Sequence, residues 1–435
     1  MNVCVAGLWH LGTVTAACLA SAGHDVVGLD EDAARVSALS QGAAPLFEPG
    51  LDDAVKRGLA SGHLRFTTDP AGAAGAADIV WITIDTPVDD DDRADVESVV
   101  ARAAGVFRHL RDGALVLISS QVPVGTTRRL EQLFAAETRG RRVTFGYSPE
   151  NLRLGNAIRA FTQPDRVVVG VRAASDRERV ERLLEPFTRS IEWMSVESAE
   201  MTKHALNAFL ATSVTFINEV ATLCEAVGAD AADVERGLKS EVRIGPKAYL
   251  SPGAAFAGGT LARDVTFLAD LGHAHGAAVP LLSAIGPSNA RHQEWAQRRL
   301  DELLGGVAGK AIAVWGLTYK PGTDTLRRSS SIALCRWLIE RGAGVHAHDP
   351  VVKRLPDDLA ARVALAASPL AAVDGASALV VSTPWPVYRE IPAADVLSRM
   401  ARGLVIDANR VTGETLGRAA GVDYVSVGRS RIATS

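Results

Sequence analysis

The sequence lacks the features that mark partners of nucleic acids or membranes. Lys and Arg together number 46 against 50 Asp and Glu, and the formal net charge of the 435 residues is −4. A chain without a basic excess is poorly suited to bind nucleic acid or a membrane surface. No apolar run approaches the roughly 20 residues that span a bilayer, and Met1 and Asn2 lead directly into an apolar strand without a signal peptide. We therefore expect a cytoplasmic protein without nucleic-acid or membrane partners.

Disulfide and metal-binding patterns are missing as well. The four cysteines stand singly inside apolar segments, without CxxC spacing, which predicts buried reduced thiols: Cys4, Cys18, Cys224 and Cys335. The histidine pairs at 273/275 and 346/348 have no third ligand nearby in the sequence, so we interpret them as structural. The acidic run 89–92 follows a strand end, but adjacent carboxylates repel one another, and a solvated loop is predicted. We expect no metal site.

What the chain does have is a nucleotide-binding pattern at its start. The apolar run 2–6 ends at Gly7, the segment GLWHLG opens a helix, and a second apolar run ends at Asp30. In such a βαβ unit Gly7 permits the tight turn, Gly12 the close contact of helix and strand, and the helix N-terminus attracts a pyrophosphate. Asp30 is placed to accept hydrogen bonds from a ribose 2′-hydroxyl, which favours NAD over NADP. Trp9 replaces the middle glycine of GxGxxG, so its backbone must approach the phosphates with the indole turned away.

The same pattern returns in the second half of the chain. Strands alternating with amphipathic helices are predicted at 78–87, 113–120, 142–150 and 165–171, and again at 310–324, 343–349, 376–386 and 403–410. We therefore predict an α/β fold with two Rossmann-like doubly wound domains on either side of a helical centre. A dinucleotide cofactor and a nucleotide-linked substrate are the expected occupants of two such domains.

The helical centre contains one long predicted helix, Ser198–Gly228. At about 1.5 Å per residue it would be roughly 45 Å long, enough to join two domains. Lys203 and Asn207 lie at i and i+4 on one face, with Asn218 close to the same face. Two interpretations remain open. Lys203 either reaches the surface and Asn207 satisfies a backbone group, or both are functional.

Motifs along the whole chain point to one family. A loop at 241–264 is rich in glycine and small residues, and Arg243, Arg263 and Asp264 supply charge there. The other motifs are GLWHLG with Asp30 and Arg35, DTP at 85–87, SSQVPVGTT at 119–127, YSPENLRLG at 147–155, EMTKHALNAFLA, RIGPKAYL, FAGGTLARD, GLTYKPGTDTLRRSS at 316–330 and DANR at 407–410. With them, the sequence resembles the nucleotide-sugar 6-dehydrogenases of the UDP-glucose/GDP-mannose dehydrogenase family.

The resemblance implies an activity and a set of catalytic residues. The family removes two hydrides from C6 of a UDP-sugar, from alcohol through aldehyde to acid, with two NAD. By position, Lys203 and Asn207 would hold the C6 oxygen, and Lys203 would stabilise negative charge there. Asp264 would help to order the catalytic water, and Glu150 is a candidate general base. Thr260 occupies the position of the family's nucleophilic cysteine.

The resemblance also implies binding residues and domain boundaries. For NAD they are Gly7, Trp9, His10, Leu11, Gly12, Asp30, Arg35, Thr86, Pro87, Gln121 and Arg327. For the UDP-sugar they are Leu152, Arg153, Leu154, Arg243, Tyr249, Leu250, Phe256, Gly258, Lys320 and Arg410. The expected domains are 1–195 for NAD, 196–297 for the helical dimerisation and active-site region, and 298–435 for the UDP-sugar. The central helices form the family's dimer interface, so we expect a homodimer in which Arg243 reaches the substrate across the contact.

The departures from the family pattern bear on the second half of the reaction. Thr260 replaces the cysteine, Arg263 a lysine, Leu154 a second carboxylate and Gln121 a cofactor-side threonine. A threonine hydroxyl is a far weaker nucleophile than a thiol unless a dedicated base activates it. The enzyme therefore either stops at the 6-aldehyde or oxidises the hydrated aldehyde without a covalent intermediate, and Thr260 is interpreted as a loop residue.

A binding protein without activity is the alternative to an enzyme. Such a protein would be under no chemical demand to keep Lys203, Asn207, Glu150 and Asp264 together, and their presence favours an enzyme.

Overall fold

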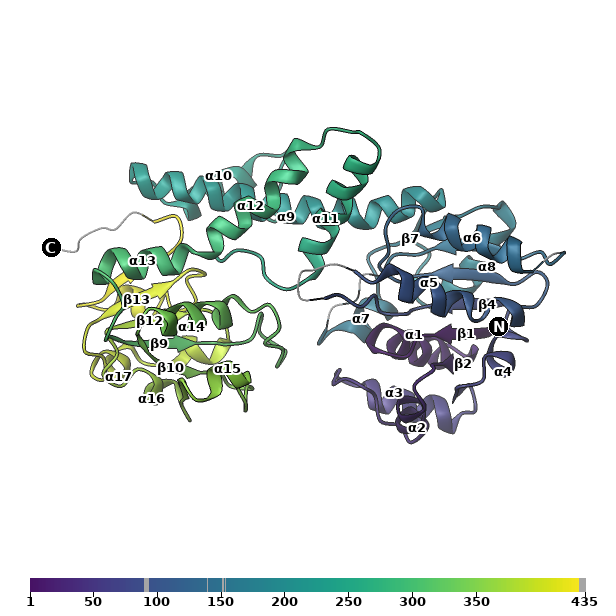
Figure 1. The fold of residues 1–435 in the computed structure, drawn as a ribbon, viewed down its shortest axis with the longest axis horizontal. Coiled ribbons are helices and arrows are strands. Elements are labelled where there is room, and N and C mark those ends of the chain that lie inside the picture. The colour runs from purple at the N-terminus through teal and green to yellow at the C-terminus, as the bar shows by residue number, and fades with distance from the viewer. Residues whose placement is uncertain (90–93, 139, 151, 153, 430–435) are drawn as a thin grey trace. The chain divides into compact units, whose positions relative to one another are not determined.

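The structure is a computed structural model that describes residues 1–89, 94–138, 140–150, 152 and 154–429 (Figure 1). The chain forms two compact units, Met1–Ala205 and Leu206–Ser435. The α/β fold predicted from the sequence is confirmed, because each unit is built around a largely or wholly parallel sheet.

The first unit contains an eight-stranded sheet in the order β3-β2-β1-β4-β5-β6-β7-β8. Its strands are β1 (Asn2–Ala6), β2 (Asp25–Leu29), β3 (Leu64–Thr67), β4 (Ile79–Ile82), β5 (Leu115–Ile118), β6 (Thr144–Tyr147), β7 (Val167–Val171) and β8 (Ile191–Met194). All neighbours pair in parallel except β6 and β7, which are antiparallel. The strand predicted at 142–150 is shorter in the structure, because β6 begins at Thr144 and ends at Tyr147.

Helices cover both faces of this sheet. They are α1 (His10–Ser21), α2 (Ala33–Ser40), α3 (Leu51–Ala60), α4 (Pro70–Ala74), α5 (Val96–Ala104), α6 (Thr126–Glu137), α7 (Ala157–Thr162) and α8 (Ala174–Leu184), with the 3-10 turn η1 (Phe107–His109). Val3 and Val5 of β1 pack into one core with α1, while Cys4 and Ala6 pack into the other. Successive strand side chains point to opposite faces, so a central strand covered on both sides must be apolar throughout.

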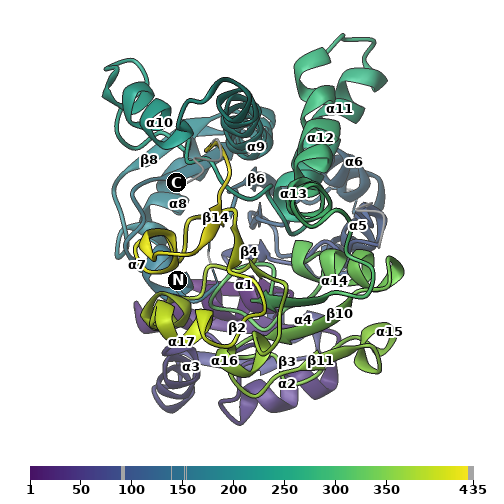
Figure 2. The ribbon, with the colours of Figure 1, turned by 90° about the vertical axis from the view of Figure 1, so that its left-hand side faces the viewer.

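The second unit combines helices with a six-stranded parallel sheet in the order β11-β10-β9-β12-β13-β14. Its strands are β9 (Ala311–Trp315), β10 (Gly344–His348), β11 (Val363–Leu365), β12 (Ala378–Val381), β13 (Leu404–Asp407) and β14 (Asp423–Val425). Its helices are α10 (Ala231–Ser240), α11 (Thr260–Ala274), α12 (Pro280–Gln293), α13 (Trp295–Leu304), α14 (Ser330–Glu340), α15 (Asp357–Ala360), α16 (Pro369–Ala372) and α17 (Ala393–Leu397), with the 3-10 turns η2 (Pro386–Glu390) and η3 (Leu416–Arg418). Helices α11 and α12 pack side by side (Figure 2).

The two sheets repeat the same turn after their first strand. Gly7 follows β1 with φ +97°, and Gly316 follows β9 with φ +89°, a left-handed conformation that suits glycine. A carboxylate at the end of the next strand then accepts a hydrogen bond from the residue after each glycine. Asp30 accepts from the N–H of Leu8 at 2.6 Å, and Asp349 accepts from the N–H of Leu317 at 2.7 Å. The predicted repetition of a nucleotide-binding unit is thus present in the structure.

The long helix α9 (Val196–Val227) has 32 residues. It begins two residues before the predicted Ser198 and ends at Val227, one residue before the predicted Gly228, whose φ is +80°. Although no uninterrupted apolar run approaches the length of a bilayer span, α9 as a whole could cross a membrane by its length and composition. The result is weak evidence for a membrane span, because the core helix of a soluble protein passes the same test. Glu200, His204 and Asn207 on this helix are buried and hydrogen-bonded inside the protein.

The four cysteines are free and buried, as predicted. Burial raises the pKa of Cys4, Cys18 and Cys335 to about 12, so these thiols are poor nucleophiles. In the described parts of the chain, no three His, Cys, Asp or Glu side chains are grouped so that they could hold a metal ion.

Candidate functional site

The turn between β1 and α1 has the shape of a pyrophosphate-binding loop. A Cβ on Gly12 would lie 1.7 Å from the carbonyl oxygen of Gly7, so only glycine permits this approach of helix and turn. The helix α1 starts at His10 and presents free N–H groups there. The Trp9 side chain is 39% exposed and lies against the guanidinium of Arg35, 5.2 Å from the ring centroid. The indole is therefore directed toward Arg35, and the turn presents its backbone to a ligand.

Asp30 lies at the end of β2, beneath this loop, and is 2% exposed. Burial opposes ionisation of Asp30, but hydrogen bonds from the N–H groups of Leu8 and Asp32 and from Arg35 outweigh it, and the pKa is lowered. Arg35 donates to both carboxylate oxygens at 2.9 Å. An ionised carboxylate at this point can accept a hydrogen bond from a ribose hydroxyl, and it repels a 2′-phosphate.

A cavity of about 300 Å³ opens over Asp30. It is lined by Gly7, Leu8, Trp9, Asp30, Arg35, Asp85 and Arg102. These residues fit the adenosine end of NAD. The nicotinamide ring of NAD would accept the hydride in the reaction. Arg102 had no signal in the sequence, because it comes from the last turn of α5, where nothing in the pattern distinguishes it from a solvated arginine. Its guanidinium pairs with Glu31 at 2.9 Å and lies 3.9 Å from Asp30.

Three other predicted cofactor residues, Thr86, Pro87 and Gln121, follow the ends of β4 and β5 in the first sheet. Thr86 donates to the carbonyl of Gln121 at 2.6 Å, and both side chains are at least nine-tenths buried. Pro87 follows directly. Leu11 lines a small cavity of about 70 Å³ together with Glu150 and Leu152.

Lys203 is buried in the first unit and does not reach the surface. Its side chain is 7% exposed, and its ammonium donates to the carbonyl of Glu150 at 2.6 Å and lies 3.4 Å from the carboxylate. The other carboxylate oxygen of Glu150 accepts the N–H of Leu152 at 2.8 Å. The structure therefore brings together the predicted positive charge and the predicted base.

Two further side chains hold this end of α9, and sequence reasoning missed both. Glu200 accepts hydrogen bonds from the N–H of Gly125 at 2.7 Å and from the N–H and hydroxyl of Thr127 at 2.9 and 2.7 Å. Burial raises the pKa of Glu200, although these hydrogen bonds counteract it. His204 contacts the carbonyl of Val122 at 2.9 Å. The helix is thus attached to the 119–127 loop that carries Gln121.

In the second unit Asn207 donates a hydrogen bond to Asp264, and both side chains are at least nine-tenths buried. Asp264 lies one turn after Thr260, the first residue of α11. Thr260 is exposed, and no described residue is hydrogen-bonded to its hydroxyl. Nothing in the described structure activates this hydroxyl as a nucleophile.

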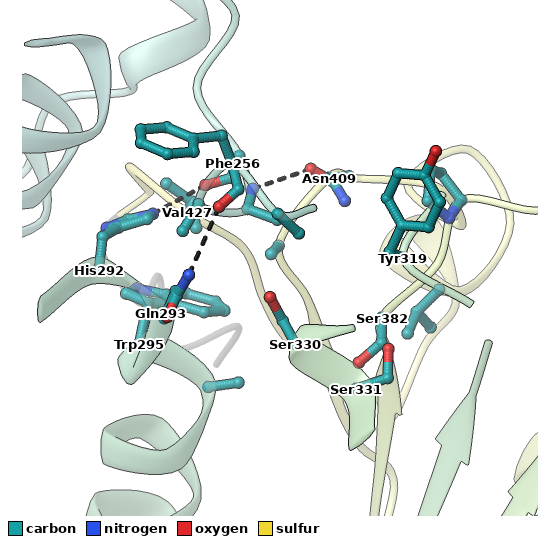
Figure 3. A pocket seen from close by; sticks show the side chains of 18 of the residues that line it. Phe256, His292, Gln293, Trp295, Tyr319, Ser330, Ser331, Ser382, Asn409 and Val427 are labelled. Carbon is teal, nitrogen blue, oxygen red and sulfur yellow. Dashed lines mark hydrogen bonds between the residues drawn. The ribbon is translucent and has the colours of Figure 1, made fainter. Parts of the chain in front are cut away.

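A second pocket, of about 430 Å³, lies within the second unit (Figure 3). Three predicted substrate residues line it, namely Tyr249, Phe256 and Lys320. Ser330 and Ser331 line it at the N-terminus of the 11-residue helix α14. A lysine beside a helix N-terminus suits a ligand that carries phosphate.

The loop on one side of this pocket is held by four polar side chains. Asn218 accepts the N–H of Gly253 at 3.0 Å, and Asn409 accepts the N–H of Ala254 at 2.9 Å. His292 contacts the carbonyl of Gly253 at 2.8 Å, and Asn289 pairs with both backbone groups of Phe256 at 3.0 Å. Figure 3 shows Asn409, His292 and Phe256 around the pocket. Asn218 of α9 thus helps to shape the pocket wall.

Several predicted residues lie elsewhere. Arg410 pairs with Asp230 at 2.7 Å and is not among the lining residues of the pocket. Arg243 is exposed and pairs with Glu241. Four more predicted residues also lie outside the pocket lining: Leu250 is buried, Leu154 half-buried, Arg327 exposed, and Gly258 against the Tyr319 ring. Arg153 is not among the residues that the structure describes. The roles of these residues stay predictions.

Comparison with known proteins agrees with this geometry. The NAD-binding, central and UDP-binding domains of the UDP-glucose/GDP-mannose dehydrogenase family match residues 1–188, 197–291 and 313–414. UDP-glucose 6-dehydrogenase from Pseudomonas aeruginosa is 37% identical over 99% of this chain and 98% of the relative. The enzyme of the same name from Rhizobium meliloti is 36% identical over 99% of this chain and 100% of its own length.

A solved structure shares the fold over almost the full length. A UDP-glucose dehydrogenase from Pyrobaculum islandicum superposes with a TM-score of 0.87 at 30% identity, covering 98% of each chain. The chain therefore belongs to the UDP-glucose/GDP-mannose dehydrogenase family and is an NAD-dependent nucleotide-sugar dehydrogenase.

Proposed function

We propose that this enzyme oxidises UDP-glucose, or a close relative of it, at C6. The observation that carries the proposal is a pair of contacts made by α9. The buried Lys203 contacts Glu150, and one helical turn later the buried Asn207 contacts the buried Asp264 of α11. Buried charges are costly unless they are paired, and two polar pairs in succession on one apolar helix point to chemistry. The names and identities of the relatives support UDP-glucose as the sugar nucleotide.

In this proposal C6 loses a hydride to NAD and its hydroxyl loses a proton to the base, which leaves an aldehyde. The ammonium of Lys203 stabilises the negative charge that develops on the C6 oxygen. Asn207 donates to the same oxygen, and Asp264 fixes the orientation of the Asn207 amide. Glu150 is positioned by Leu152 and Lys203 to accept a proton.

Thr260 acts in this proposal as a loop residue and not as a covalent nucleophile. Its exposed hydroxyl has no basic partner among the described residues. Water then adds to the aldehyde, and the hydrate loses the second hydride to a second NAD and a proton to the base, which gives the acid without an acyl-enzyme. The competing outcome is release of the 6-aldehyde after one hydride.

The amount of NADH formed per UDP-glucose tests the proposal. Two NADH per UDP-glucose are expected for the acid, one indicates the aldehyde, and none refutes UDP-glucose as the substrate. Thr260→Ala is expected to keep most of the activity, whereas Thr260→Cys is expected to give a covalent adduct by intact mass. Loss of NADH production in a folded Thr260→Ala variant that still binds both ligands would show that the hydroxyl takes part in the chemistry.

We also propose a homodimer through α9. Three large apolar side chains spaced seven residues apart are exposed on this helix: Phe209 at 70%, Phe216 at 50% and Leu223 at 65%. Residues seven apart share a helix face, and an exposed apolar stripe of this length marks an interface. Phe216→Glu is expected to yield monomers in light scattering coupled to gel filtration, and a dimer that persists would exclude this face. A cytoplasmic location and the domain limits 1–195, 196–297 and 298–435 belong to the same proposal.

A further inference from the structure

Glu48 is a buried carboxylate in the loop between α2 and α3. It is 4% exposed, whereas its neighbour Phe47 is 88% exposed. The chain therefore turns the polar side chain inward and leaves the aromatic one in solvent. A glutamate is rarely buried unless partners compensate for the loss of water. The hydrogen-bond partners of Glu48 therefore indicate its role.

The partners of Glu48 come from two segments far apart in the sequence. One carboxylate oxygen contacts Nε2 of His10 at 3.0 Å and accepts the N–H of Gly155 at 2.9 Å. The other oxygen accepts the N–H of Ala157 at 2.8 Å. His10 is the first residue of α1 and belongs to the pyrophosphate-binding turn. Gly155 and Ala157 end the segment that carries the predicted substrate residues.

That segment is held at both ends. Lys203 binds its first part at the carbonyl and carboxylate of Glu150. Glu48 binds its last part through two backbone N–H groups. Leu152 and Leu154 lie between these two attachments. One carboxylate therefore connects His10 with the far end of the substrate segment.

We propose that Glu48 is a positioning residue that couples the binding of NAD to the binding of the nucleotide sugar. The proposal rests on the proposed function and adds a link between its two ligands. A dinucleotide bound at the N-terminus of α1 fixes His10, and His10 fixes Glu48. Glu48 then holds Gly155 and Ala157 in the conformation that receives the sugar nucleotide. By linkage, the sugar nucleotide must tighten the binding of the dinucleotide by the same factor.

The test measures coupling rather than activity. The dissociation constant of NADH is determined by fluorescence with and without UDP-glucose, and that of UDP-glucose by calorimetry with and without NADH. In the wild type each ligand is expected to tighten the other at least about fivefold, the lower end of typical couplings. In Glu48→Gln the amide cannot accept all three contacts, and the factor is expected to fall below about twofold.

Two further variants separate coupling from folding. His10→Phe keeps a ring of similar size and leaves the bonds to Gly155 and Ala157 in place, so it should lose the coupling without unfolding. Glu178→Gln removes the same charge from the exposed face of α8 and should keep the coupling. If Glu48 had a purely structural role, Glu48→Gln would weaken the binding of both ligands. The factor by which each ligand tightens the other would then stay at its wild-type value.

The proposal is overturned if the wild type shows no coupling, or if Glu48→Gln or His10→Phe retains the wild-type factor. NADH formation from UDP-glucose by the wild type is measured first. Its absence refutes the proposed function alone, and the same binding measurements with UDP as the second ligand then still decide the role of Glu48.

Discussion

Replacing Lys203 by methionine removes one positive charge and keeps the length of the side chain. Lys203 is 7% exposed and donates to Glu150. Methionine fills the same apolar surroundings and makes neither contact. The substitution therefore isolates the charge from the packing.

Two effects on free energy have to be compared. Loss of one preorganised donor to a developing oxyanion costs about 2.7–4 kcal/mol of transition-state stabilisation, or about 10² to 10³ in kcat. Loss of the contact to Glu150 costs about 1–3 kcal/mol of stability, nearer the lower end, because the Glu150 side chain is 24% exposed and water can replace the ammonium. The rate effect is the larger one, and the protein is expected to remain folded.

Single-turnover formation of NADH from UDP-glucose is the assay, with the KM for UDP-glucose measured alongside. We expect a fall of at least about 100-fold in the rate and a smaller change in KM, because the charge matters most in the transition state. Lys239→Met is the matched control, since Lys239 also pairs with a glutamate, Glu235, but lies on α10. A Lys203→Met rate within threefold of the control would refute the assignment.

Three other substitutions test the structure. Asp30→Ser is expected to raise kcat/KM for NADP relative to NAD by about tenfold or more, because the repelling carboxylate is gone; an unchanged ratio would contradict this. Gly12→Ala places a Cβ 1.7 Å from the Gly7 carbonyl, and we expect about 3 kcal/mol less stability in urea unfolding together with weaker NADH binding. The hydrogen bond from Arg172 lowers the pKa of Glu197 from 4.5 to about 2, so its stabilisation is complete above pH 4.5 and is lost toward pH 2. Glu197→Gln should cost about 1 kcal/mol at pH 7 and flatten the acid side of the unfolding profile, and an unaltered profile would refute the pairing.

Local rules explain why the first nucleotide-binding turn was predictable. Gly7, Gly12 and Asp30 have their positions fixed by one strand, one turn and one helix, and the sequence separation is short. The left-handed φ of Gly7 and the bond from Leu8 to Asp30 follow from that geometry. The repeat in the second half follows from the same rules.

Contacts between distant segments were not predictable from pattern. Glu48 binds a residue 107 positions further along the chain, Glu200 one 75 positions back and His204 one 82 positions back. No periodicity marks such residues, because a buried carboxylate and a solvated one look alike in a sequence. Arg102 at the adenosine cavity was missed for the same reason.

The position of the Lys203 charge is itself a consequence of such contacts. Glu200 and His204 are one turn apart on α9 and form one row, and Lys203 and Asn207 form the adjacent row. The first row is fixed by hydrogen bonds to the 119–127 loop. A shift of one residue would turn the helix by about 100° and remove these bonds, leaving buried polar groups unpaired. The bonds of the first row therefore set the rotation of α9, and that rotation directs Lys203 toward Glu150.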